Sequence, residues 1–167
     1  FVLSFQEYLP INPDGKPSLE PTLAFNTALS FITNTNLQHY SGEVSLSYFS
    51  QLSLMWLQFV SAATGISALV AAARAMSGSK SMGDFFIDVA TASLLVLLPL
   101  ATIVSVCLSI GGVPMTLAGA VEATTLEGAT QTIARGPVAA FVAIKQLGTN
   151  GGGFFGPNST HPLENPT

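Results

Sequence analysis

The sequence has 167 residues, of which 49% are hydrophobic and only 8% are charged, and its formal net charge is −4. Soluble domains carry about 25% charged residues, so this composition favours a membrane protein over a soluble one. The 5 Lys and Arg residues form no basic stripe, which excludes nucleic acid as a partner. The one cysteine, Cys107, lies in an apolar run and is predicted to be a buried hydrophobic side chain.

The first part of the chain predicts one short helix that is too short to cross a membrane. Residues 1–9 resemble the last turns of an apolar helix, and the Pro- and Asn-containing segment 10–21 predicts turns outside the bilayer core. Residues 22–32 form an uncharged, helix-compatible stretch. At about 17 Å it reaches roughly half of the hydrocarbon thickness, so this helix can enter a bilayer and stop there.

Two longer apolar runs follow, and each is predicted to span the membrane. Residues 52–73 and 89–110 contain no charged side chain, and each gives about 33 Å of helix. Pro99 lies in the middle of the second run. In a membrane, neighbouring groups can satisfy the carbonyl that this proline leaves without a donor.

The charges around the loop between these spans predict the orientation. Arg74 and Lys80 are the basic residues of this loop, and the positive-inside rule puts such a loop in the cytoplasm. Asp88, at the start of the second span, is a candidate ion-pair partner of either residue. Both short helices then lie on the external side, because two spans return the chain to the same face.

The sequence therefore predicts an all-α membrane protein divided into segments with alternating roles. Residues 116–135 are rich in Thr, Gly and Ala and are expected to form an ordered external loop before a second short helix over 137–147. The expected order is the end of a membrane helix, an external loop, a first pore helix and its loop (1–51), a transmembrane helix (52–76), a cytoplasmic loop (77–84), a transmembrane helix (85–113), an external loop (114–136), and a second pore helix with its loop (137–167).

One short pattern occurs twice in the chain. Each copy has a Pro, then an Ala and a Phe, and, eight residues after the Phe, a Thr-Asn pair. All five positions match at one offset, 137 − 21 = 116: Pro21/Pro137, Ala24/Ala140, Phe25/Phe141, Thr33/Thr149 and Asn34/Asn150. Because two predicted spans separate the copies, they are expected to be parallel repeats related by an axis along the membrane normal.

The loop after each copy has the chemistry of a cation pathway. Irregular backbone is tolerated at membrane depth where it lines a cavity, and its carbonyls can then replace the water shell of an ion. The glycines among residues 148–153 allow the backbone to approach an ion closely. Neither loop contains Asp or Glu, which favours a monovalent ion such as potassium over calcium, since calcium usually binds carboxylates.

Lys145, four residues before Thr149, is a cation beside this pathway. Two interpretations are open from the sequence. Its head can reach water or pair with a carboxylate such as Glu164. Alternatively, it is a fixed positive charge that limits the occupancy of ions below the second loop.

Four stretches of the chain closely resemble the potassium-transporting ATPase A subunit (KdpA) family. They are residues 25–43, with Thr-Asn-Thr-Asn, residues 59–66, residues 136–156, with Gly-Thr-Asn-Gly-Gly-Gly-Phe-Phe, and residues 161–166. The resemblance covers nearly the whole sequence, and the glycine-rich stretch is highly specific. Gly156-Pro157 departs from the family pattern, in which a polar residue is expected at this place. The departure lies past the filter and affects only the expectations about the outer vestibule.

The resemblance implies a fold and a role. The fold is that of potassium transporters built from four helix–pore-loop–helix repeats around one filter, of which about two are expected in this chain, an internal fragment of a longer protein. The implied role is potassium selection at the external side of a bacterial or archaeal plasma membrane. Gln38 is implied at the filter mouth, and the implied filter residues are Thr33, Asn34, Thr35 and Asn36 in loop one and Thr149, Asn150, Gly151 and Gly152 in loop two.

The implied partners are a P-type ATPase catalytic subunit (KdpB), which hydrolyses ATP, and small accessory membrane subunits of the complex. The chain itself shows no catalytic constellation, so we expect no enzymatic activity of its own and no organic cofactor beyond the potassium ion. Two alternatives stay open. The first is a stand-alone Trk/Ktr-like potassium channel or uptake protein driven by the membrane potential. The second is a non-conducting membrane scaffold, although a scaffold would not require the same Thr-Asn pair after each short helix.

We predict that residues 1–167 do not fold stably alone, because two of four filter walls leave polar backbone facing lipid. The measurement is size-exclusion chromatography in detergent followed by limited proteolysis. A monodisperse and protease-resistant fragment would contradict this expectation.

Overall fold

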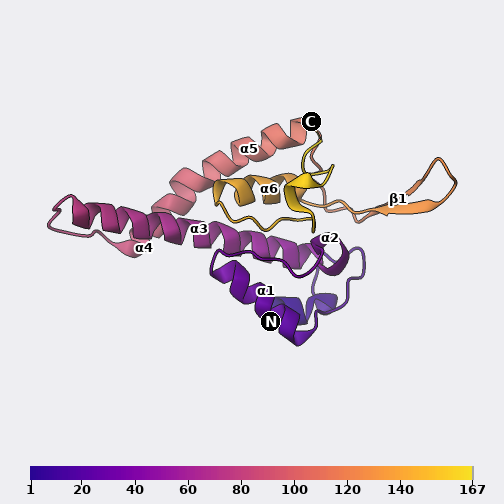
Figure 1. Ribbon diagram of the computed structural model, residues 1–167, viewed down its shortest axis with the longest axis horizontal. Coiled ribbons are helices and arrows are strands. Elements are labelled where there is room, and N and C mark those ends of the chain that lie inside the picture. The colour runs from indigo at the N-terminus through magenta and orange to yellow at the C-terminus, as the bar shows by residue number, and fades with distance from the viewer. Residues whose placement is uncertain (167) are drawn as a thin grey trace.

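The computed structural model describes residues 1–166. One long helix, α3 (Tyr48–Met76), runs through the middle of the molecule (Figure 1). The short helices α1 (Pro21–Ile32) and α6 (Val138–Leu147) lie on opposite sides of it, and α5 (Leu98–Ile110) lies beyond α6. Both short helices predicted from the sequence are confirmed.

Two helical segments are long and apolar enough to cross a bilayer. They are Tyr48–Met76, with 29 residues, and Phe85–Ile110, with 26 residues. The first begins earlier than the predicted residue 52, because Ser47 caps it: its hydroxyl accepts a hydrogen bond from the Ser50 N–H. A one-turn helix, α2 (Gly42–Ser45), precedes it in a segment that the sequence predicts to be a polar loop.

The second span changes its hydrogen-bond pattern before Pro99. It is divided into α4 (Phe85–Thr91), a π-helical segment η3 (Ala92–Leu97) and α5. The N–H of Leu98 donates to the carbonyl of Ser93, five residues earlier. This wider turn accommodates the missing N–H of the proline within one continuous helical rod.

The connection between the spans is held by an ion pair. The guanidinium of Arg74, near the end of α3, donates to both carboxylate oxygens of Asp88 on α4. Arg74 also donates to the carbonyl of Met82 at 3.1 Å. The predicted pairing of Asp88 with one of the two loop cations is thus confirmed, and Arg74 is the partner.

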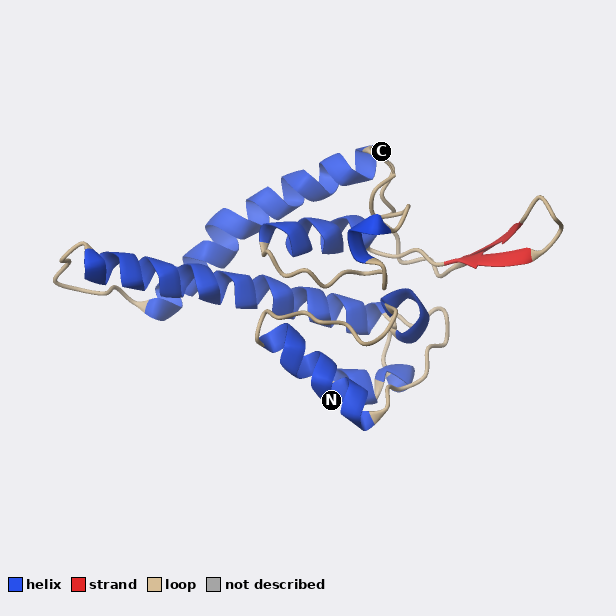
Figure 2. Ribbon diagram, viewed as in Figure 1, coloured by secondary structure: helices blue, strands red, loops and turns tan. Residues whose placement is uncertain are grey.

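The mostly helical fold agrees with the prediction, but part of residues 116–135, expected to be an external loop, forms two short strands. Strands β1 (Val121–Thr124) and β2 (Thr130–Ile133) form an antiparallel hairpin that projects away from the helices (Figure 2). The turn between them contains Gly128 at φ +84°. The β-branched residues of the two strands suit a pleated ribbon: Val121, Thr124, Thr130, Thr132 and Ile133. The sequence showed turn and β-branched residues here, but they form too short a pattern to separate a hairpin from a loop.

Two further expectations are corrected. Residues 1–9 are two 3₁₀ turns, η1 (Val2–Ser4) and η2 (Gln6–Tyr8), not an α-helix, because Phe5 at φ −130° separates them. Cys107 is exposed on α5 rather than buried. Since α5 is apolar on all sides, its outward face can meet lipid, and an apolar side chain there needs no cover from this part of the chain.

Side-chain caps and small residues fix the helices around the loops. The carboxylate of Glu20 accepts hydrogen bonds from the N–H groups of Thr22 and Leu23 at the start of α1. A hydrogen bond from the Thr22 hydroxyl, together with these two backbone bonds, holds the pKa of Glu20 below its usual value. On α3, Ala62 and Ala63 are buried against the loop after α6 and against η3, and their small size permits this close approach.

We predict that Ala63→Leu lowers the thermal stability of the complete protein. Ala63 is 0% exposed, and adding methylenes to a packed interior costs about 1–3 kcal/mol. Ala72→Leu, at an exposed position of the same helix, is the matched control. Thermal unfolding in detergent should separate the two variants, and equal melting temperatures would contradict this account of the packing.

Candidate pore-loop site

The loops that follow α1 and α6 meet beside α3, and residues at equivalent positions of the two copies contact each other. The side-chain amide of Asn150 donates to the Oδ1 of Asn34 across 116 positions, which is the offset of the sequence repeat. A Cβ at Gly152 would lie 2.8 Å from the Cβ and from the carbonyl oxygen of Asn36, again its equivalent. Equivalent residues lie this close where two copies approach a shared axis.

Burial follows the same equivalence. Thr33 and Thr35 in loop one are exposed, and so are their counterparts Thr149 and Gly151 in loop two. Asn36 is buried, at 4% exposure, and its counterpart Gly152 is buried as well. Each loop therefore presents alternate residues to an open side and packs the others against the second loop.

The backbone of both loops enters the left-handed region at alternate residues. In loop one these are Asn34 at φ +61° and Asn36 at φ +53°, and in loop two they are Thr149 at φ +54° and Gly151 at φ +92°. Asparagine and glycine tolerate this conformation, but a β-branched threonine does so only where its surroundings enforce it. Thr149 is therefore a strained position, and such strain concentrates at functional sites.

Most of the backbone carbonyls in the two loops are free of protein donors. Within residues 1–166, no hydrogen bond is donated to the carbonyl oxygens of Thr33, Asn34, Thr35, Thr149, Asn150 and Gly151. The carbonyl of Gly152 differs, because it accepts a hydrogen bond from the Gln58 side chain at 2.8 Å. Of the predicted filter residues, all but Gly152 therefore have a carbonyl without a protein donor among residues 1–166, and Asn36 and Asn150 are themselves buried.

Three glutamine side chains form hydrogen bonds with the backbone at the end of loop two and directly after it. Gln58, on α3, is 0% exposed and holds Gly152. Gln38 donates to the carbonyl of Gly153 and accepts from its N–H, both at 2.9 Å, so it joins loop one to loop two. Gln51 donates to the carbonyl of the next residue, Phe154, at 3.2 Å.

Two carboxylates continue this set of contacts. Phe155 N–H donates to Glu164 at 3.2 Å, and Gly156 N–H donates to Glu43 at 2.8 Å. Every residue from Gly152 to Gly156 is therefore hydrogen-bonded through its backbone to a side chain from another part of the chain. We call residues 152–156 the braced strand. It fixes the second loop without a regular sheet or helix.

Of these five side chains, the sequence singled out Gln38 as a site residue and Glu164 as a possible partner of Lys145. The bracing roles of Gln51, Gln58 and Glu43 were missed. A signal existed for Gln58, because it is a polar side chain within an otherwise apolar membrane span, and such residues usually face a partner or a pathway. Gln51 and Glu43 lie in the polar segment before the span predicted from the sequence, where nothing marked them.

The positive charge of Lys145 is compensated by an ion pair in the structure. Its Nζ lies 2.5 Å from a carboxylate oxygen of Glu164 and 3.0 Å from the hydroxyl of Ser159. Lys145 and Glu164 are 2% and 4% exposed. Of the two interpretations left open by the sequence, pairing with Glu164 is therefore confirmed.

Some buried polar atoms behind the loops have no hydrogen-bond partner among residues 1–166. They include both amide atoms of Asn36, one atom each of Gln58 and Asn150, and the hydroxyl of Tyr40. Burial raises the pKa of Tyr40 above its usual range, so its phenol is neutral at physiological pH. Such atoms normally bind ordered water.

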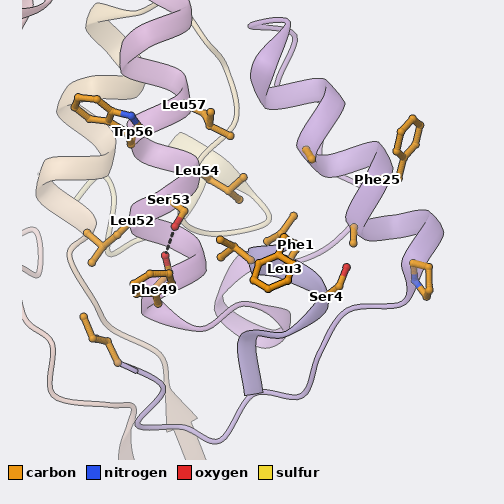
Figure 3. A pocket seen from close by; sticks show the side chains of 15 residues that line it. Phe1, Leu3, Ser4, Phe25, Phe49, Leu52, Ser53, Leu54, Trp56 and Leu57 are labelled. Atoms are coloured by element: carbon orange, nitrogen blue, oxygen red, sulfur yellow. Dashed lines mark hydrogen bonds between the residues drawn. The ribbon is translucent and has the colours of Figure 1, made fainter. Parts of the chain in front are cut away.

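Two hollows lie near these elements, and only the smaller one adjoins the loops. It has a volume of about 570 Å³ and is lined by Thr33 and Asn34 of loop one and by residues of α3, including Ser61 and Thr64. The larger one, of about 770 Å³, lies between α1, η1 and the first half of α3. Its lining is almost entirely apolar, with Phe25, Leu54, Trp56 and Leu57 (Figure 3), so it is unsuited to an ion.

The site offers oxygen ligands without charge. Among residues 1–166, no group of three or more His, Cys, Asp or Glu side chains could hold a metal ion. The available ligands for an ion are the oxygen atoms of backbone carbonyls, Thr hydroxyls and Asn side-chain amides. This is the ligand set of a weakly bound, weakly hydrated monovalent cation rather than of a transition metal.

The comparison with known protein families is decisive. The model of the family described as "Potassium-transporting ATPase A subunit" (KdpA) matches residues 1–167. The chain belongs to the potassium-transporting ATPase A subunit family.

Curated relatives within this family are similar over the entire sequence. The chain is 57% identical to a protein of Pseudomonas aeruginosa and 55% identical to one of Flavobacterium psychrophilum, with 99% and 100% of the chain covered. A protein of Pseudomonas fluorescens is 54% identical. Each is named "Potassium-transporting ATPase potassium-binding subunit". The chain spans 30% of the length of these relatives.

In this family member, we predict that Gly152→Ala destabilises the protein. The added Cβ would meet the backbone of Asn36 at 2.8 Å, so the two loops must separate. The matched control is Gly65→Ala on α3, where a Cβ meets nothing within 4 Å, and where alanine favours the helix by about 0.5–1 kcal/mol. Thermal unfolding in detergent is the measurement, and a Gly152→Ala variant as stable as wild type would contradict the contact between the loops.

Proposed function

We propose that this chain forms two of the four pore loops of a potassium-selective filter in the potassium-binding, channel-like subunit of an ATP-driven uptake complex. The observation that carries the proposal is the set of free carbonyls on two repeated loops that contact each other at equivalent residues. The proposed filter residues are Thr33, Asn34, Thr35, Asn36, Thr149, Asn150, Gly151 and Gly152, with Gln38 at the mouth.

The geometry supports carbonyl coordination in particular. A carbonyl replaces a water molecule of the ion most readily where no protein donor occupies it, and seven of the eight filter residues, all but Gly152, meet this condition. Of these, we propose that the first three of each loop coordinate the ion. For Gly152 and Asn36, we propose a supporting role, since the first is held by Gln58 and the second is buried against loop two.

The electrostatics favour a monovalent cation. Each loop follows the C-terminal end of a short helix, and this end carries a partial negative charge. No carboxylate lies in either loop. The one nearby cation, Lys145, is compensated by Glu164, so it adds no net charge to oppose an ion.

We further propose the topology predicted from the charges: the subunit lies in the plasma membrane, with both pore loops external and the Arg74–Lys80 loop cytoplasmic. Two helices long enough to span support this. The relatives' name, potassium-binding subunit of a potassium-transporting ATPase, supports a complex of several subunits. We propose that its catalytic subunit is a P-type ATPase that hydrolyses ATP and that small accessory membrane subunits assist. A stand-alone channel or uptake protein needs the same filter, so only a coupling experiment separates the two.

We predict that Gly151→Asp lowers the apparent affinity for potassium or its selectivity over sodium. At φ +92°, Gly151 has a conformation that aspartate adopts only with strain, and the open space around it lets the carboxylate reach the pathway. A change of about tenfold in half-maximal potassium concentration corresponds to about 1.4 kcal/mol. The measurement is potassium-stimulated ATP hydrolysis by the complete complex.

The matched control is Gly151→Asn, which is similar in size, meets the same backbone conformation with similar strain and carries no charge. It should shift the potassium dependence less than Gly151→Asp. If both variants keep the affinity and selectivity of wild type, the site assignment is wrong. If hydrolysis does not respond to potassium while uptake follows the membrane potential, the channel-like alternative is correct.

A further inference from the structure

A buried ion pair lies directly behind the second filter loop. Lys145, in the last turn of α6, and Glu164, beyond the braced strand, are both more than nine-tenths buried. The pair lies outside the proposed coordinating residues, and cation coordination by the loops makes no direct use of it. The inference below rests on the proposed filter function.

Glu164 uses its two carboxylate oxygens for different partners. Oε2 accepts a hydrogen bond from Lys145 Nζ at 2.5 Å, and Oε1 accepts one from the backbone N–H of Phe155 at 3.2 Å. Phe155 is 1% exposed. Without Glu164, its N–H would therefore be buried without a partner, which is costly.

The pair also touches the end of the filter loop. A Cβ on Gly153 would lie 3.0 Å from Glu164 Oε1 and 3.2 Å from Lys145 Nζ. The charged groups therefore lie against the backbone of Gly153, and a side chain at this position would displace them. Through Gly153 and Phe155, the pair is in contact with the chain on both sides of Phe154.

Stability alone does not explain such a pair. Removing two charges from water costs more than their attraction often returns, and apolar residues of similar volume are commonly as stable. A carboxylate at this place does something that an apolar residue cannot do, because it accepts the Phe155 N–H and thereby fixes the path of the braced strand. Lys145 then serves to hold the carboxylate in the correct orientation.

We propose that Glu164 is a positioning residue of the potassium filter: its carboxylate, oriented by Lys145, holds the backbone at Phe155 and so sets the positions of the carbonyls in loop two. It contacts no ion itself. The property that depends on it is the apparent affinity for potassium and the discrimination against sodium, rather than the maximal rate of ATP hydrolysis.

The test compares two uncharged double variants in the complete complex. Lys145→Met/Glu164→Gln removes both charges but keeps an acceptor for the Phe155 N–H. Lys145→Met/Glu164→Met removes the charges and the acceptor at nearly the same side-chain volume. The readouts are the potassium and sodium concentrations that half-maximally stimulate ATP hydrolysis, the maximal rate, and the melting temperature of the purified complex.

We expect Lys145→Met/Glu164→Met to need about tenfold more potassium than wild type, since a buried N–H loses its partner, with a smaller change in maximal rate. The glutamine variant should recover most of the affinity. If the two double variants have the same potassium and sodium dependence, the acceptor is not what matters and the proposal is overturned. A loss confined to the melting temperature would also overturn it, because it would show a merely structural role.

If Lys145→Met/Glu164→Met does not assemble, Glu164→Asp replaces it in the comparison. This variant keeps the charge but shortens the side chain, so that one carboxylate no longer reaches both partners, and the same loss of potassium affinity is expected. Unchanged affinity in Glu164→Asp overturns the proposal. Gly151→Asp is measured alongside: if it shifts the potassium dependence and the Glu164 variants do not, the filter assignment stands and only the positioning role fails.

Discussion

In the proposed filter, the structure depends on one constraint: backbone carbonyls that are to face an ion must be free to coordinate it, and yet be held in place. Regular secondary structure cannot do this, because it uses its carbonyls internally. The loop after α6 meets the constraint by fixing the neighbouring residues instead. Each residue of the braced strand is held by a Gln or Glu side chain from α3, from the segment before it, or from the segment after loop two. The free carbonyls of Thr149, Asn150 and Gly151 lie immediately before it.

The helix α3 contributes to this arrangement in several ways. The helix α3 is long enough to span a membrane and also supplies Gln51 and Gln58 to the braced strand, while its small residues Ala62 and Ala63 let α6 and the second loop approach. The hollow beside Thr33 and Asn34 continues along α3 past Ser61 and Thr64. In the proposed filter, α3 is thus both a support of loop two and a wall of the space next to loop one.

The sequence predicted those parts of the fold that rest on local patterns. The two short helices, the two spans and the repeat followed from charge-free lengths and from one offset. The ion pairs of Arg74 with Asp88 and of Lys145 with Glu164 were among the alternatives that the sequence left open. The hairpin, the π-helical segment before Pro99 and the 3₁₀ turns were not predicted, because each depends on hydrogen bonds over a few residues with weak sequence preferences. The contacts of Glu43 and Gln51 were inaccessible, since they join positions about a hundred residues apart that no local pattern connects. For Gln58, the sequence marked a polar residue in an apolar span but not its partner Gly152.

The central claim is that a potassium-like cation binds to the free carbonyls of the two loops. The most direct test is the location of rubidium or thallium by anomalous diffraction in crystals of the complete complex. The account predicts density at coordination distance from the carbonyls of Thr33 to Thr35 and of Thr149 to Gly151, between the two loops. Ion density elsewhere, with these carbonyls occupied by hydrogen bonds from other segments of the protein, would contradict it.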